Sequence, residues 1–234
     1  MRSLCILGDS IGKGVVWNEN NGRYTVLDDS FSALLAEKTS ISVKNHAAFG
    51  STIERGIKIA QRHLGELGVY DAVLLEFGGN DCDFDWASIA NAPDDDHSPK
   101  TPISTFEEKY LELIAEVKKA GGTPLLMNLP PIDSVRYFQR VSTGIDGGAV
   151  LEWLGDKSRI YRWHEMYSIA VQRVAKLTGT PVIDIRTAFL SRRDCPELIC
   201  ADGIHPNRSG HMQIAETVAE FLCSFGMQEA CVPA

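Results

Sequence analysis

Short apolar runs alternate with longer segments of helical pattern along most of this chain, and the alternation limits the fold more than any other feature. Short apolar runs suit strands, and helical segments between them favour parallel strands joined by crossover helices. Strands are predicted at residues 4–7, 41–43, 72–77, 123–129 and 181–185, with an extension of the second to residue 46 left open. Helices are predicted at residues 31–38, 53–67, 106–120, 160–177 and 209–225.

Right-handed crossovers cover both faces of a parallel sheet with helices. The predicted fold is therefore an α/β, three-layer α/β/α sandwich of flavodoxin-like type with a central five-stranded parallel sheet, and residues 1–234 are treated as one domain. Two segments, at about residues 82–103 and 130–156, depart from the pattern and are predicted to be irregular insertions. Side chains that bind ligands are expected at the carboxyl ends of the strands.

The composition excludes some partners. A net charge of −8 and a pI near 5.3 argue against nucleic acid, because phosphate-binding surfaces concentrate Lys and Arg. The N-terminal apolar run is too short for a secretory signal, and no run reaches the ~20 apolar residues that span a bilayer. We therefore expect a cytoplasmic protein without stable membrane insertion.

The six cysteines include no CxxC pair, so reduced thiols are expected rather than zinc ligands. The sequence does not indicate an oligomeric state.

A candidate nucleophile follows the first predicted strand. Ser10 lies in Gly8-Asp9-Ser10, a tripeptide that is also common in turns and helix N-caps. A serine hydroxyl needs a neighbouring base before it attacks at neutral pH. Asp202 and His205, three residues apart before the last predicted helix, provide a carboxylate and an imidazole. A turn there brings Asp202 to Nδ1 of His205 and leaves Nε2 for Ser10.

Two further strand ends carry groups suited to binding an oxyanion. Asn80, in Gly78-Gly79-Asn80-Asp81, offers a side-chain amide after the third predicted strand. Gly50, in Ala48-Phe49-Gly50-Ser51, offers a backbone N–H after the second. Glycine lets the backbone approach a substrate closely, although both sequences are also ordinary turns.

These four blocks, in this order, resemble the SGNH hydrolases, also called GDSL hydrolases, a family of serine esterases and lipases. The resemblance extends from residue 8 to residue 207, and Ile11 replaces the leucine of the longer Gly-Asp-Ser-Leu motif. It implies that Ser10 attacks an acyl carbon, that His205 acts as general base and then general acid, and that Asp202 orients His205. It also implies an oxyanion hole formed by the N–H groups of Ser10 and Gly50 and by the Asn80 amide. No metal or cofactor is implied.

Residues beside these blocks and in the two insertions are expected to bind substrate. They are Asp9, Phe49, Asp81, Tyr137 and Trp153. Tyr137, Phe138 and Trp153 either form a lid or anchor the second insertion to the body of the protein. Asp83 and Asp85 are expected to give the pocket an acidic rim that disfavours anionic substrates.

The predicted function is hydrolysis of a small-molecule carboxylic ester through an acyl-enzyme intermediate. Short acyl groups, such as acetate on a carbohydrate or another small alcohol, are preferred. The alternative is a lysophospholipase or thioesterase, which needs a long apolar groove near Phe49, Tyr137 and Phe138. A more distant alternative is a non-catalytic, flavodoxin-like phosphate-binding module using residues 8–14, although their glycine spacing fits neither the P-loop nor the GxGxxG motif.

The remaining reactive side chains suggest no second site. His97 lies beside Asp94, Asp95 and Asp96, but these residues form one contiguous loop without ligands converging from other elements. The histidines without a partner motif are interpreted as surface or satisfied core residues: His46, His63, His164 and His211. Cys82 is interpreted as a packing residue near Asn80.

Overall fold

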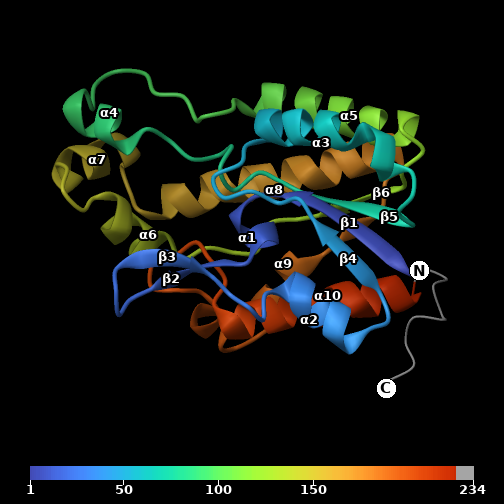
Figure 1. The fold of residues 1–234 in the computed structure, drawn as a ribbon. Coiled ribbons are helices and arrows are strands. Elements are labelled where there is room, and N and C mark those ends of the chain that lie inside the picture. Colours follow the sequence, from blue (N-terminus) through green and yellow to red (C-terminus); the bar gives the residue numbers. More distant parts are fainter. Residues whose placement is uncertain (225–234) are drawn as a thin grey trace.

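The computed structural model describes residues 1–224, and its centre is a parallel sheet (Figure 1). The strands of this sheet are β1 (Ser3–Gly8), β4 (Ser42–Asn45), β5 (Ala72–Glu76), β6 (Pro124–Met127) and β7 (Val182–Ile183). Their spatial order is β4-β1-β5-β6-β7, and all neighbouring pairs are parallel. The predicted five-stranded parallel sheet is thus confirmed. The chain runs from β1 to β4 and then returns to β5 on the other side of β1, so the order reverses at the carboxyl ends of β1 and β5.

Helices cover both faces of the sheet, which confirms the three-layer arrangement (Figure 1). One face is covered by α3 (Ile53–Leu67), α5 (Ile103–Lys119) and α8 (Ser158–Thr178). The other is covered by α2 (Phe31–Lys38), α9 (Ile185–Leu190) and α10 (Arg208–Ser224). Side chains of β1 alternate between the two cores because successive residues of a strand point to opposite faces. Residue 225, the last of the predicted final helix, lies outside the described residues.

The carboxyl end of the sheet carries the elements that the sequence did not predict (Figure 1). A hairpin of β2 (Val15–Asn18) and β3 (Arg23–Val26) follows the short helix α1 (Ser10–Lys13). The first insertion contains α4 (Trp86–Asn91), and the second contains α6 (Ser134–Val141) and α7 (Gly147–Leu154). A 3-10 helix, η1 (Cys195–Leu198), precedes α10. The prediction that residues 130–156 are irregular is therefore wrong.

Aspartate caps explain why the second insertion is helical. Asp133 accepts hydrogen bonds from the N–H groups of Val135 and Arg136, and Asp146 accepts them from Gly148 and Ala149. Such caps satisfy N–H groups that the first turn of a helix leaves without partners. Both helices have only eight residues, and the amphipathic pattern of α6 and the two capping aspartates were signals that the prediction missed.

The two insertions pack against each other and form a third apolar cluster beside the sheet. Phe84 from the first insertion contacts Trp153 from the second and Trp163 from α8, in each case with 5.1 Å between ring centroids. Tyr137 and Leu154 are buried in the same cluster. The insertions therefore form one wall above the carboxyl ends of the strands.

The lengths of the helices and the pairing of the cysteines bear on two further predictions. Within residues 1–224, no helix is both long and apolar enough to cross a bilayer. Free thiols are present at Cys5, Cys82, Cys195 and Cys200, as expected. Cys223 is disulfide-bonded, so the expectation of reduced thiols is wrong for that residue.

Close packing of α3 on the end of β5 positions the loop that carries Asn80. Phe77 is fully buried, and a Cβ atom built on Gly56 would lie 2.4 Å from its ring. Gly65, on the same helix, is exposed and has no atom within 4 Å of such a Cβ. Only the first glycine is therefore required by packing.

We predict opposite effects for two alanine substitutions on α3. Gly56→Ala forces Phe77 to move and should lower the free energy of unfolding by about 1–3 kcal/mol. Gly65→Ala should raise it by about 0.5–1 kcal/mol, because alanine favours an open helical site. Urea denaturation measures both, and equal effects of the two substitutions would contradict the packing argument.

Candidate active site

The three side chains predicted to act together form one hydrogen-bonded chain. Asp202 Oδ2 lies 2.6 Å from Nδ1 of His205, and Nε2 of His205 lies 3.0 Å from the Ser10 hydroxyl oxygen. All three residues are buried. A carboxylate only accepts hydrogen bonds, so the imidazole proton belongs on Nδ1 and Nε2 is left to accept from Ser10. This arrangement can withdraw a proton from the serine hydroxyl.

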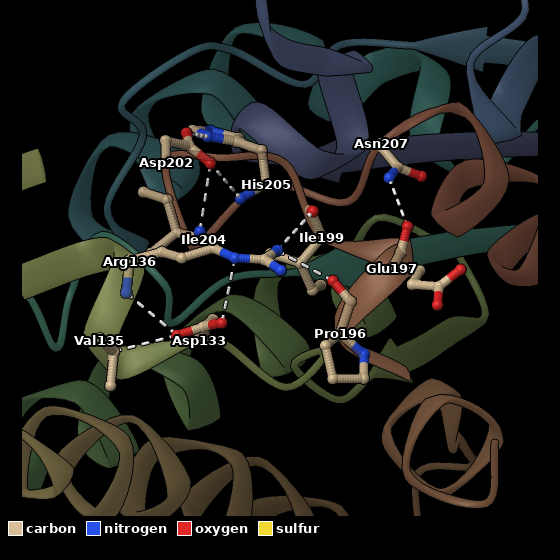
Figure 2. A network of polar contacts seen from close by, with 10 residues as sticks. All are labelled: Asp133, Val135, Arg136, Pro196, Glu197, Ile199, Asp202, Ile204, His205 and Asn207. Atoms are coloured by element: carbon tan, nitrogen blue, oxygen red, sulfur yellow. Dashed lines mark hydrogen bonds and ion pairs between the residues drawn. The ribbon is translucent and has the colours of Figure 1, made fainter. Parts of the chain in front are cut away.

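The loop from Asp202 to His205 is shaped by local backbone geometry. Asp202 Oδ1 accepts hydrogen bonds from the N–H groups of Ile204 and His205, both at 3.2 Å (Figure 2). Gly203 has a φ of +83°, which favours glycine, and a Cβ there would lie 2.4 Å from the backbone nitrogen of Tyr137. The Gly203 carbonyl accepts from Asp133 N–H at 2.8 Å. The second insertion is thus packed directly on this loop.

Arg136 connects the insertion to the segment that precedes Asp202 (Figure 2). Its guanidinium donates to the carbonyl oxygens of Pro196 and Ile199 at 2.9 and 3.1 Å, and it forms an ion pair with Asp133 at 3.2 Å. Ile199 and Pro206 also form an isolated antiparallel bridge. The loop carrying Asp202 and His205 is held by these contacts on both sides.

Ser10 is positioned by the short helix α1 and by a buried carboxyl beneath it. Glu76 Oε2 accepts hydrogen bonds from the N–H groups of Asp9 and Gly12, at 3.1 and 3.0 Å. Burial, and then the nearby Asp9 carboxylate, raise the pKa of Glu76 well above its usual value. A Cβ on Gly8 would lie 2.8 Å from Glu76 Oε2. Glu76 therefore uses N–H groups that a phosphate-binding loop would need for its ligand, which argues against the phosphate-binding alternative.

The residues proposed to hold an oxyanion line the same cavity. Asn80 Nδ2 donates to Asp9 Oδ2 at 3.0 Å, and the second hydrogen of an amide nitrogen remains for another acceptor. Gly50 has a φ of +69°, a conformation that favours glycine. Both residues line the cavity that contains Ser10 and His205.

A cavity of about 490 Å³ opens above Ser10. Four of the residues expected to bind substrate line it, namely Asp9, Phe49, Tyr137 and Trp153. The Tyr137 hydroxyl donates to Asp83 at 2.6 Å, and Trp153 packs on Phe84, so these aromatic residues anchor the insertions while they line the cavity.

Comparison with known proteins identifies the family. The model of the GDSL-like lipase/acylhydrolase family matches residues 6–213. The chain belongs to this family. As a GDSL-like hydrolase it is a carboxylic ester hydrolase, for which a catalytic triad and an oxyanion hole are typical. None of the curated proteins matches the chain.

Solved structures share the fold of this GDSL-like hydrolase. A lipase/acylhydrolase from Enterococcus faecalis has a TM-score of 0.66 at 22% identity, covering 100% of this chain and 99% of that one. An acetyl-xylooligosaccharide esterase from Geobacillus, solved as a mutant, has a TM-score of 0.63 at 21% identity, covering 96% and 94% of the two chains. An acetyl xylan esterase has a TM-score of 0.64 at 17% identity, covering 94% and 99%.

Asp81 does not bind substrate from the cavity, so that prediction is wrong. Its side chain is fully buried and does not line the cavity. Both carboxylate oxygens accept from Ile53 N–H at the start of α3, at 3.0 and 3.2 Å. Burial raises the pKa of Asp81 to about 6. Its side chain therefore fixes the start of α3 to the loop that follows Asn80.

The expected acidic rim is also wrong, because cationic side chains balance it. Asp83 lines the cavity but forms an ion pair with Lys100 at 2.8 Å and accepts from Trp86 Nε1 at 2.9 Å. Asp85 does not line the cavity. Arg140 and Arg159 do, and they contribute positive charge.

Several cavity residues were not predicted from the sequence. Tyr24, on the hairpin, lies against the His205 ring with 5.1 Å between centroids. Trp163 and His164 reach the cavity from α8, and burial lowers the pKa of His164 to about 3, so its ring is neutral. Because these residues lie on elements without catalytic motifs, the sequence had no signal that separated them from ordinary packing residues.

We predict that Asp81 makes stability depend on pH. Its pKa of about 6 in the folded protein lies above its ordinary value of 3.8, so between these values the folded state binds more protons than the unfolded state. The stability that this proton provides is present below about pH 4 and is lost as pH rises through 6. Asp81→Asn removes the titration. We therefore compare the free energies of unfolding of the two proteins. The value for Asp81→Asn minus the value for wild type should increase by roughly 2–3 kcal/mol from pH 4 to pH 7, because only wild type loses the contribution of this proton.

Urea unfolding of both proteins at pH steps between 4 and 8 measures this difference. The buried Asp9 and Glu76 carboxyls titrate in both proteins and so largely cancel in the comparison. A difference that does not change with pH would show that Asp81 is ionised throughout.

Proposed function

We propose that this GDSL-like hydrolase uses Ser10 as its nucleophile, His205 as general base and acid, and Asp202 to orient His205. The observation that carries the proposal is the hydrogen-bonded chain from Asp202 through His205 to Ser10, which ends in the cavity. Such a chain activates a serine hydroxyl that is otherwise a weak nucleophile.

The reaction proceeds in two steps. In the first, Ser10 Oγ attacks the ester carbonyl carbon, its proton moves to His205 Nε2, and the carbonyl oxygen becomes negative. Collapse of this intermediate breaks the bond to the alcohol oxygen, which takes the proton from His205. In the second, water loses a proton to His205 and attacks the acyl carbon. The bond from that carbon to Ser10 Oγ then breaks, Oγ takes the proton back from His205, and the carboxylic acid is released.

Three donors are proposed to stabilise the negative oxygen. They are the backbone N–H groups of Ser10 and Gly50 and the free amide hydrogen of Asn80. Asn80 is held by Asp9, so little reorganisation is needed when charge develops. Loss of one such donor typically lowers kcat by about 10²–10³.

The substrate is proposed to be a short-acyl ester, such as an acetyl ester, of a carbohydrate or another small alcohol. The cavity combines the aromatic side chains of Trp86, Trp153 and Trp163 with charged groups, including Arg159 and the Asp83–Lys100 pair. Aromatic faces with polar groups between them suit sugars, which present apolar C–H faces and a ring of hydroxyl groups. The folds shared with an acetyl xylan esterase and an acetyl-xylooligosaccharide esterase are consistent with this class.

The cavity lining supports the lysophospholipase or thioesterase alternative less well. Phe138 is buried in the insertion cluster and does not line the cavity, and the Tyr137 hydroxyl is bound to Asp83. A long acyl chain would have to pass charged groups that lose hydration without gaining partners.

Labelling with a fluorophosphonate tests the nucleophile. The reagent should phosphonylate Ser10 Oγ and release fluoride, giving one adduct that mass spectrometry locates at residue 10. Ser10→Ala should give no adduct and lose activity by at least about 10⁴-fold. Ser88→Ala, a control at an exposed serine in α4, should label normally. An adduct elsewhere, or none on folded wild-type protein, would refute the assignment.

Substrate profiles test the acyl and alcohol preferences. Among p-nitrophenyl esters of two to sixteen carbons, kcat/KM should be highest for the shortest chains. Trp153→Ala should raise KM for an acetylated xylooligosaccharide about tenfold, the loss of one stacking contact, with little change for ethyl acetate. Preference for long chains, or equal KM changes for both substrates, would exclude the carbohydrate ester.

A further inference from the structure

Three potential metal ligands converge where the segment that follows β4 meets α3. His46 follows β4, while His63 and Glu66 lie three residues apart on α3. One potential ligand atom from each residue lies within 4.8 Å of the other two. None of the three residues lines the cavity that contains Ser10. The ester hydrolase reaction therefore does not account for this cluster.

The two imidazole rings are arranged to face one carboxylate oxygen. They stack with 3.7 Å between centroids and 28° between planes. Nδ1 of His63 lies 2.5 Å from Glu66 Oε1, and Nε2 of His46 lies 3.2 Å from the same oxygen. Two nitrogens and one oxygen thus point to a common centre from two separate elements.

Hydrogen bonding alone does not satisfy this arrangement. His46 Nε2 is buried, and its 3.2 Å contact with Glu66 Oε1 does not have the geometry of a hydrogen bond. A metal ion between the three groups would accept the Nε2 lone pair of His46 when the ring proton is on Nδ1, and the Glu66 carboxylate would balance part of its charge.

We propose that His46, His63 and Glu66 bind a divalent transition-metal ion of the zinc type. The ligands are Nε2 of His46, Nδ1 of His63 and a carboxylate oxygen of Glu66. Two imidazole nitrogens and one carboxylate suit Zn²⁺, which takes N and O ligands at about 2.0–2.2 Å in tetrahedral geometry. Ca²⁺ and Mg²⁺ require sets of oxygen ligands instead. The fourth position faces solvent and takes water.

An ion can reach this site from solvent. The side chains of His63 and Glu66 are 31% and 39% exposed, whereas that of His46 is 12% exposed. His46 therefore forms the inner ligand, and the two α3 residues form the entrance. Lys44 lies close enough to oppose a cation electrostatically, but its side chain is exposed and can turn toward solvent.

Binding should fasten α3 to the edge of the sheet and leave hydrolysis unchanged. The segment between His46 and Gly50 is already fixed by hydrogen bonds from His46 N–H to Ile6 and from Ala48 N–H to Gly8, at 2.9 and 3.0 Å. The metal is thus a structural ligand, and its binding is measurable whether or not the proposed nucleophile is correct.

Calorimetric titration of the full chain with ZnCl₂ tests the site, with Co²⁺ absorption as a probe of tetrahedral geometry. Wild type should bind one Zn²⁺ and show a raised Tm. His63→Ala and Glu66→Gln should each weaken binding at least tenfold and abolish the rise in Tm. Lys44→Ala should bind more tightly. His97→Ala, a control in the other cluster of histidine and acidic residues, should bind as wild type does.

Unchanged circular dichroism and urea midpoints in metal-free buffer show that the variants fold, which is expected because both positions are partly exposed. Equal Zn²⁺ affinity in wild type, His63→Ala and Glu66→Gln would overturn the proposal. So would the absence of binding to wild type at 100 µM Zn²⁺, or an octahedral Co²⁺ spectrum.

Discussion

The parallel pairing of β1 with β5 is the constraint on which the active site depends. Its register places Gly8 beside Glu76, so the two strands end together. The segment after β1 then carries Ser10, and the segment after β5 carries Asn80, within reach of one another through Asp9. A shift by one residue would turn alternate side chains to the opposite face and separate these groups. The buried apolar residues of both strands make such a shift unfavourable.

The second insertion supports the active site from the other side. The Gly203 backbone packs against the start of α6, and Arg136 holds the carbonyl oxygens that precede Asp202. The same insertion contributes Tyr137 and Trp153 to the cavity. The aromatic groups that line the cavity and the Asp202–His205 loop are therefore parts of one packed unit, and a change in the insertion is expected to affect both.

Sequence patterns predicted the sheet, the flanking helices and the Ser10–His205–Asp202 set, because each rests on a local signal. Strands buried on both faces read as continuous apolar runs, and the chemical groups follow them directly. The hairpin had no such signal, since four-residue strands carry little periodicity, whereas the amphipathic pattern of α6 and the capping aspartates of both insertion helices were present in the sequence but not recognised. Asp81 was misassigned because its neighbour Asn80 faces the cavity, whereas its own side chain turns toward α3. His46 and His63 are distant in the sequence and come together only in the fold, where the segment after β4 meets α3.

Burial of the Glu76 and Asp9 carboxyls lowers the stability of the folded protein, but their hydrogen bonds fix the backbone and side chains around Ser10. Two like charges at this depth cannot both ionise without a large loss of hydration energy, so Glu76 keeps its proton. A neutral Glu76 still accepts the two N–H groups that shape the turn before Ser10. Asp9 can then remain the acceptor that orients the Asn80 amide. An apolar side chain at position 76 would avoid the burial cost, but it would leave those N–H groups without partners in the turn that holds Ser10.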